Sequence, residues 1–309
     1  MTAFEERETN ISARYFDGKT RTILSLYIYR PGNPSSAIWF DRALNAIGAG
    51  TDFGDVEQAS NLMTRFRPSG ATKASGLSAV FPVENGNFRS TGGALYRAGQ
   101  WLVKVRISSA ELSTERLDAA MRRALEGIPA LEGVDDSVVE FVVPCDEPLV
   151  FGETAPIEPD TGLAASMALM SDVISAIAEG TENENKDAAK PVSYCREGEW
   201  NPQYNVYRPI GQADRYSLVF GDSGSSVEVY PFLLTNEEKA ADANTPTHLV
   251  SSSTGTETSF YTPFRGMPGP GPASRSAFRG PVYAKVNRRL SPDENPQITI
   301  SAGPSKEEN

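Results

Sequence analysis

The spacing of apolar and polar side chains predicts two strand-then-helix units near the start of the chain. Residues 21–30 are rich in β-branched and aromatic side chains, with apolar residues on both faces, which is typical of an internal strand. After a break at residues 31–34, large apolar side chains recur every four residues from Trp39 to Ile47. This period predicts an amphipathic helix, which Gly48 ends.

The second unit has a more one-sided pattern. Residues 100–107 alternate between apolar and charged side chains, so we expect Lys104 and Arg106 to point to solvent and the apolar face to meet a core. An apolar stripe at helical spacing follows, with Ser113 as its N-cap and Gly127 as its stop. The two units share a layout but few residues.

Weaker patterns predict further elements in the first 180 residues. The apolar residues of 55–66 fit a short helix, those of 76–83 and 137–143 fit strands, and those of 160–180 form the strongest helical stripe. The polar residues 181–187 follow this stripe without any pattern, which favours a boundary or an exposed loop.

Beyond residue 190 the pattern changes to short strands without a comparable helix. Residues 262–281 are so rich in proline and glycine that we expect a long surface loop there. The sequence therefore predicts an α+β protein, an antiparallel sheet packed by amphipathic helices, with a smaller strand- and loop-rich C-terminal part. The expected units are residues 1–180, residues 190–301 and a flexible tail at 302–309.

Charge and hydropathy exclude several classes of partner. The formal net charge is −11, which repels nucleic acid and anionic lipid headgroups, so we expect no nucleic-acid partner. No window approaches the ~20 apolar residues of a membrane helix. Residues 1–8 lack the apolar core of a signal peptide, which fits both a cytoplasmic protein and an exported chain whose signal has been removed.

The two cysteines give a clue to the compartment. Cys145 and Cys195 each follow or join a predicted strand, and they lie on either side of a 50-residue excursion. A sparse, even number of cysteines in an acidic, turn-rich chain favours a disulfide and hence a periplasmic or secreted protein. The alternative, two free thiols in the cytoplasm, stays open.

The motifs that resemble catalytic or metal sites have simpler explanations. Residues 221–224, Gly-Asp-Ser-Gly, resemble the tetrapeptide around the serine-protease nucleophile, but His248, the only histidine, lies downstream of them, and a turn explains them better. His248 has no evident ligand partner, although a pair with Cys145 is possible in space. The acidic stretches 52–57 and 182–187 lack the spacing of a calcium loop. We therefore expect no metal, cofactor or nucleotide.

Aromatic residues are the best candidates for binding a ligand or a partner. They cluster around Cys195 and beside the proline- and glycine-rich stretch, and the set consists of Trp200, Tyr204, Tyr207, Tyr261 and Phe264. Amphipathic rings serve interfaces well. The competing explanation is that they supply bulk to a C-terminal core that is poor in leucine and isoleucine.

Two segments carry a resemblance to known proteins. The strand at 27–30 with its Trp-Phe-Asp-Arg helix at 39–42, and the strand at 99–106 with its following helix, look like uncharacterised exported proteins of Gram-negative bacteria. Their layout is loosely similar to the PsbP-like α/β/α sandwich, over about the first 180 residues. This resemblance implies a fold and no catalytic residue.

Three functions follow as hypotheses. The first is a non-enzymatic envelope or periplasmic protein that binds a protein partner or a small ligand. The second is an enzyme of unrecognised family, such as a hydrolase, whose site forms only in three dimensions. The third is a cytoplasmic structural or assembly component.

Overall fold

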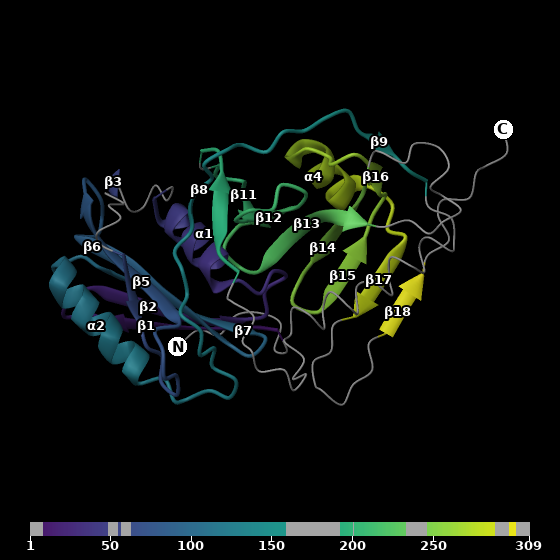
Figure 1. Ribbon diagram of the computed structural model, residues 1–309. Helices are drawn as coiled ribbons and strands as arrows, with labels where there is room; N and C mark the ends of the chain where they lie inside the picture. The colour runs from purple at the N-terminus through teal and green to yellow at the C-terminus, as the bar shows by residue number, and fades with distance from the viewer. Residues whose placement is uncertain are drawn as a thin grey trace.

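The structure is a computed structural model that describes residues 9–48, 55–56, 63–158, 192–199, 201–232, 246–287 and 297–300. Figure 1 shows two sheets side by side, one built from the first part of the chain and one from the second. Within these residues no helix is both long and apolar enough to cross a membrane.

The first sheet is seven-stranded and antiparallel, in the order β1-β2-β7-β6-β5-β3, with β4 also paired to β5. Its strands are β1 (Asn10–Asp17), β2 (Thr22–Tyr29), β3 (Asp55–Val56), β4 (Met63–Phe66), β5 (Gly76–Glu84), β6 (Ser90–Ala98) and β7 (Trp101–Ser109). As expected for an internal strand, β2 lies between β1 and β7. The predicted helix at residues 55–66 is wrong at its described ends, which pair with β5 as β3 and β4.

Two helices cover the two faces of this sheet. Helix α1 (Ser36–Gly48) buries Trp39, Phe40 and Ile47 against β5, β6 and β7. Helix α2 (Thr114–Glu126) buries Leu117 and Met121 on the opposite face. Because alternate residues of a strand point to opposite faces, both sides of β7 lie in a core.

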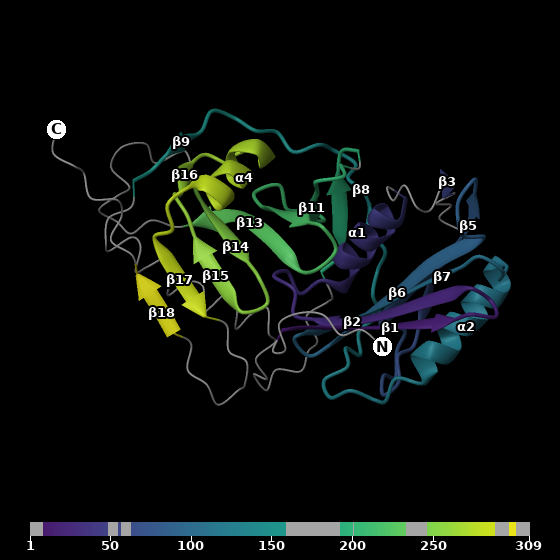
Figure 2. The same ribbon diagram turned by 180° about the vertical axis from the view of Figure 1, so that it is seen from behind.

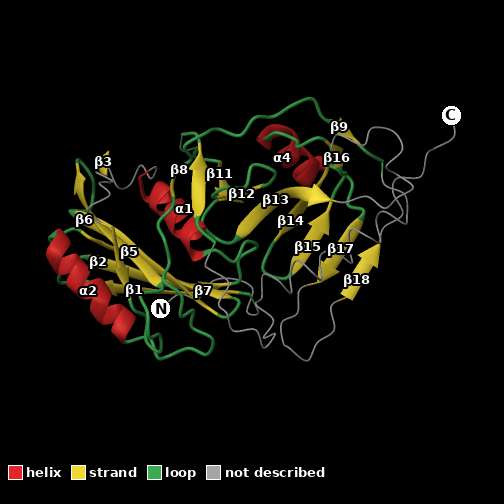
Figure 3. Ribbon diagram, viewed as in Figure 1, coloured by secondary structure: helices red, strands yellow, loops and turns green. Residues whose placement is uncertain are grey.

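The second sheet follows the order β18-β17-β15-β14-β13-β12-β11-β10-β8, and α1 lies between it and the first sheet (Figures 1 and 3). Its strands are β8 (Val143–Pro144), β9 (Ala155–Pro156), β10 (Tyr194–Glu197), β11 (Tyr204–Pro209), β12 (Tyr216–Phe220), β13 (Ser225–Phe232), β14 (Thr247–Ser253), β15 (Glu257–Phe260), β16 (Phe264–Arg265), β17 (Ala284–Asn287) and β18 (Gln297–Ile300). The mainly antiparallel α+β class is confirmed, with strands more prominent than helices.

Helix α4 (Pro270–Arg279) overturns the prediction of an irregular loop over residues 262–281. Both of its prolines lie in the first turn, where backbone N–H groups have no partner within the helix, so proline costs little there. Ala273 and Ala277 are buried against the second sheet, where α4 covers β13 and β14. Residues 270–279 form a helix because Pro270 and Pro272 precede its second turn and Pro281 follows its last residue.

The connection between the sheets also differs from expectation. Of the strand predicted at residues 137–143, only Val143 is paired, as part of β8, which runs parallel to β10. Val139 and Phe141 pack beside the α1 core without joining a sheet. The apolar side chains of Val139 and Phe141 therefore contribute to packing. Strands β8 and β9 pair with the second sheet, although they belong to the unit predicted to end at residue 180.

Several predictions lie outside the described residues. These are the helix at 160–180, the polar segment 181–187, the ring of Trp200 and the tail at 302–309.

Candidate functional site

The aromatic residues predicted to bind a partner lie in two different cores. Tyr207 is fully buried in the cluster around α1, whereas Tyr261 and Phe264 are buried under α4. Tyr204 is half-buried and stacks on Phe220. This burial favours the packing explanation, since these rings present no common surface to a partner.

The two cysteines form a disulfide. The Cys145 and Cys195 sulfur atoms are 2.06 Å apart, and the bond joins the end of β8 to β10. Glu197 lies close to both sulfurs, but its carboxylate accepts hydrogen bonds from Arg208 and from the Leu149 N–H. Metal binding by cysteine requires thiolates, and both sulfurs are used in the bond.

Residues 221–224 form the turn between β12 and β13, which confirms the turn explanation. His248 is buried on β14, where its Nε2 lies 3.0 Å from the Asp214 carbonyl oxygen, and burial lowers its pKa. It pairs with Pro231, five positions along β13 from Ser226, so roughly 17 Å of strand separates it from the turn. Ser223 and His248 therefore do not form a catalytic pair.

The turn instead fixes the second sheet to the first. The Arg42 guanidinium on α1 donates to the carbonyl oxygens of Gly221, Asn201 and Pro202 and to Oδ1 of Asn205. Beside it, Asp41 accepts from Arg196 and from the Tyr207 hydroxyl. Four donated bonds from one rigid guanidinium hold the loop ends of the second sheet on α1.

Lys104 completes this junction and corrects its predicted exposure. Its side chain is only 8% exposed, and Nζ donates to both the backbone oxygen and Oδ2 of Asp222, at 2.6 and 2.9 Å. The rings of Tyr27 and Tyr29 lie beside the ammonium. Burial lowers the pKa of Lys104. Burial alone would raise the pKa of Asp222, but the ion pair with Lys104, together with the charges of Arg106 and Arg42, leaves that pKa lowered.

A second polar cluster lies where the chain enters α1. The Asn33 amide donates to Ser217 Oγ and to Glu228 Oε1, and the Ser217 hydroxyl donates to the other Glu228 oxygen. Burial raises the pKa of Glu228. This cluster and the Lys104 junction are closed around their own partners, so they bind the two sheets to each other and offer no room to a ligand.

An open site in the described part of the chain is a groove between α2 and the β1–β2 edge of the first sheet. Its cavity volume is about 480 Å³, within the range of small-molecule sites. Tyr15, Leu24 and Ile107 are paired across β1, β2 and β7, so their side chains form one row of the floor. We call this site the α2 groove, and its lining is Tyr15, Phe16, Asp17, Thr20, Thr22, Leu24, Ile107, Leu112, Arg116, Ala119, Ala120 and Arg123.

The groove exists because α2 lies over β5, β6 and β7 and leaves the outer strands uncovered. Figure 3 shows α2 along this outer face of the sheet. On the side that faces the groove, α2 presents Ala119 and Ala120, whose small side chains do not fill the space above β2. At these two positions the helical wall of the groove is therefore apolar and formed by short side chains.

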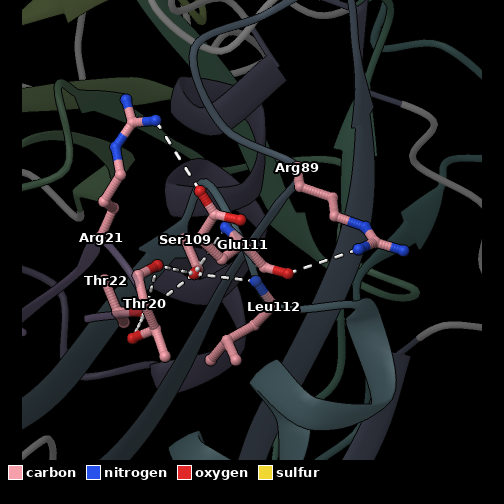
Figure 4. Close-up of polar contacts among 7 residues, drawn as sticks. All are labelled: Thr20, Arg21, Thr22, Arg89, Ser109, Glu111 and Leu112. Carbon is pink, nitrogen blue, oxygen red and sulfur yellow. Dashed lines mark hydrogen bonds and ion pairs between the residues drawn. The ribbon is translucent and has the colours of Figure 1, made fainter.

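Hydroxyl groups close one end of the groove. The Thr22 hydroxyl donates to Ser109 Oγ over 2.8 Å, and the Ser109 hydroxyl donates to the Thr20 carbonyl over 2.9 Å. Ser109 Oγ also accepts from the backbone N–H groups of Glu111 and Leu112 (Figure 4). These bonds fix the β1–β2 turn against the loop that leads to α2, so this end of the groove is rigid.

An ion pair and a hydrogen bond lie beside the same end of the groove. Arg21 pairs with the Glu111 carboxylate at 3.8 Å, and the Arg89 guanidinium donates to the Glu111 carbonyl (Figure 4). Both are exposed, so they contribute little to stability.

The charges of the groove differ from those of the whole chain. Arg116 and Arg123 lie seven positions apart on α2, roughly 10 Å along the helix, at the rim. In the part of the chain described, neither has an ion-pair partner, whereas Arg122, which is not in the lining, pairs with Asp118. Asp17 is the acid of the lining, and hydrogen bonds from Thr20 and Lys19 lower its pKa and use its oxygens within the turn.

Sequence reasoning missed the α2 groove. A signal was available in residues 10–17, where Ile11, Ala13 and Tyr15 alternate with polar side chains and predict a strand. Nothing in the sequence places this strand two positions from β7, or shows that α2 stops short of covering it.

No family model matches the chain, and neither a curated protein nor a solved structure matches it.

Proposed function

We propose that this chain is a non-enzymatic binding protein of the bacterial envelope or periplasm, and that its ligand is a small amphipathic anion held in the α2 groove. The observation that supports this most directly is that Arg116 and Arg123 lie above an apolar floor and have no ion-pair partner among the described residues. An apolar ligand body would cover Leu24 and Ile107 while its acidic group meets the guanidinium groups, which suit carboxylates and phosphates.

The overall charge strengthens the argument. A chain of net charge −11 repels anions over most of its surface. Arg116 and Arg123 are exposed and have no ion-pair partner among the described residues, so they create a local attraction for anions on an otherwise acidic protein.

A binding role fits the groove better than catalysis does. Its lining contains no histidine, cysteine or lysine, and its carboxylate, Asp17, is engaged in its own turn. A general base needs a free position beside the substrate. The Cys145–Cys195 disulfide supports an oxidising compartment, which is the basis for the proposed location.

The test is a fluorescence titration with anilinonaphthalene sulfonate, an apolar anion, followed by competition. Dodecanoate should displace the probe, whereas dodecyltrimethylammonium, with the same chain and the opposite charge, should not. Equal displacement by both would contradict the role of the arginines.

Variants locate the binding in the groove. Ala119→Trp fills the exposed wall, and Arg116→Glu with Arg123→Glu reverses the rim charge, so each should weaken dodecanoate binding by about tenfold or more, equivalent to about 1.4 kcal/mol. Arg122→Gln, on the same helix but outside the groove lining, is the matched control and should bind as the wild type does. Unchanged binding in Ala119→Trp would place the ligand elsewhere.

A further inference from the structure

Strand β1 is the outermost described strand on one side of the first sheet. Among the described strands it pairs only with β2, and the register is regular over all eight of its residues. Ile11, Tyr15 and Phe16 are 47, 50 and 69% exposed, although they belong to a strand. A long, regular edge strand that carries exposed apolar side chains is a template for another strand. Figure 2 shows β1 and β2 along this side of the sheet, with α2 beyond them.

We propose that the occupant of this edge is a second copy of the chain, paired antiparallel through β1 about a twofold axis. Such an axis stands perpendicular to the sheet, so a given residue faces the same side in both copies. Residues directly opposite each other in a sheet also face the same side. In the allowed registers, an odd-numbered residue therefore lies opposite an odd-numbered one and an even-numbered residue opposite an even-numbered one. The twofold axis then passes beside one residue, which lies opposite its own copy.

Charge and length select one of these registers. Centring on Ala13 places Ile11 opposite Tyr15 of the second copy, Ser12 opposite Arg14 and Asn10 opposite Phe16, so Ile11 and Tyr15 form apolar pairs and no like charges meet. Centring on Arg14 opposes two arginines, and centring on Ser12 shortens the paired length. The strand is thus self-complementary in one register.

This dimer completes the α2 groove, and in that respect the inference rests on the proposed function. In one copy the groove has a single helical wall and opens at the β1 edge. In the dimer the floor continues through four strands, β2, β1 and their two counterparts, with α2 of each copy on the same face. Tyr15 of one copy then lies beside Ile11 of the other in a floor bounded by two arginine-bearing helices.

Charge variants test the register by sedimentation of the full chain across a range of concentrations. Ser12→Arg places arginine opposite Arg14 in two symmetry-related pairs and should raise the dimer dissociation constant about fivefold. Adding Arg14→Glu to Ser12→Arg should restore the wild-type constant, because each pair is then of opposite charge. A wild-type chain that stays monomeric at all concentrations would overturn the proposal.

Cross-linking gives a second, independent readout. Directly opposite residues are about 4.5–5.5 Å apart between Cα atoms, within disulfide range, so Ala13→Cys should form a covalent dimer on mild oxidation. Arg14→Cys is the matched control, because its two copies would be roughly 8 Å apart in this register. Faster cross-linking of Arg14→Cys than of Ala13→Cys would reject the Ala13-centred register.

The two proposals fail separately. If dodecanoate binds and the protein is monomeric, the groove of a single copy is the site and the dimer is rejected. If the protein dimerises through β1 and no anion binds, the proposed ligand is rejected.

Discussion

Lys104 is buried although the sequence pattern assigned it to the correct face of its strand. The alternation of residues 100–107 assigned Lys104 to the solvent face, and it does lie opposite the α2 core. What the alternation could not supply was Asp222, a partner 118 positions away that covers that face. Local periodicity predicts which residues share a face and leaves open what lies on it.

Removing the lysine should destabilise the protein. In Lys104→Met, Asp222 loses its partner, and breaking such a pair costs about 3 kcal/mol; the partial exposure of Asp222 places the loss at the lower end of the usual range. Urea unfolding measures this. Adding Asp222→Asn should recover part of the loss, whereas Lys19→Met, at an exposed turn, should stay within about 0.5 kcal/mol of wild type.

Glu228 should make stability depend on pH. Because burial raises its pKa in the folded state, the folded protein holds this proton more tightly than the unfolded chain does. Its contribution to stability is then complete below the ordinary pKa of 4.5 and decreases as the pH rises through the folded value.

Glu228→Gln removes this dependence. The variant should be more stable than wild type at pH 7, and the difference should shrink as the pH approaches 4. Urea unfolding at pH 4, 5.5 and 7 checks it, with the exposed Glu126→Gln as control. A difference that grows on acidification would contradict the assignment.

At the scale of elements, the β12–β13 turn depends on two glycines with different constraints. Gly221 has φ of +56° with open space where a Cβ would lie. Gly224 has φ of +108°, and a Cβ there would meet the Arg30 carbonyl at 3.1 Å and the Tyr29 ring at 3.2 Å. The second position is therefore restricted both by its backbone and by the first sheet.

Alanine substitutions should separate these two effects. Gly221→Ala should cost about 1 kcal/mol, the usual cost of a left-handed L-residue, whereas Gly224→Ala should cost about 2 kcal/mol or more. Thermal unfolding of both variants gives the order. Equal losses would mean that the contact with Arg30 and Tyr29 yields easily.

The elements themselves were predictable where the local signal was strong. Helices α1 and α2 and strands β2, β5 and β7 follow from periodicity and from clear start and stop residues, and the change to short strands beyond residue 190 was also predictable. Helix α4 was not predicted, because a high content of proline and glycine is typical of loops, whereas proline in the first turn of a helix is tolerated. The groove could not be predicted, since it depends on which strands α2 leaves uncovered.

At the scale of the whole molecule, the disulfide ties the connection between the sheets to the first long strand of the second sheet. It closes a loop of about 50 residues, and in the chain-entropy model a loop of that length contributes about 4 kcal/mol. Cys145→Ala with Cys195→Ala should lower the free energy of unfolding by about that amount. Urea unfolding of the oxidised wild type and of the variant measures it, and equal stabilities would show that β8 and β10 hold the connection without the bond.

The pairing of Lys104 with Asp222 also has a consequence for synthesis on the ribosome. At ~5–20 residues per second, the 118 residues that separate the partners take on the order of ten seconds to translate. During that interval the strands of the first sheet and α1, which packs against Tyr29, are already synthesised, but the part of the face around Tyr27 and Lys104 lacks its β12–β13 partner. The ammonium that costs solvation energy in the finished protein keeps this face hydrated in the nascent one, which lowers its tendency to capture other apolar chains before the β12–β13 turn arrives.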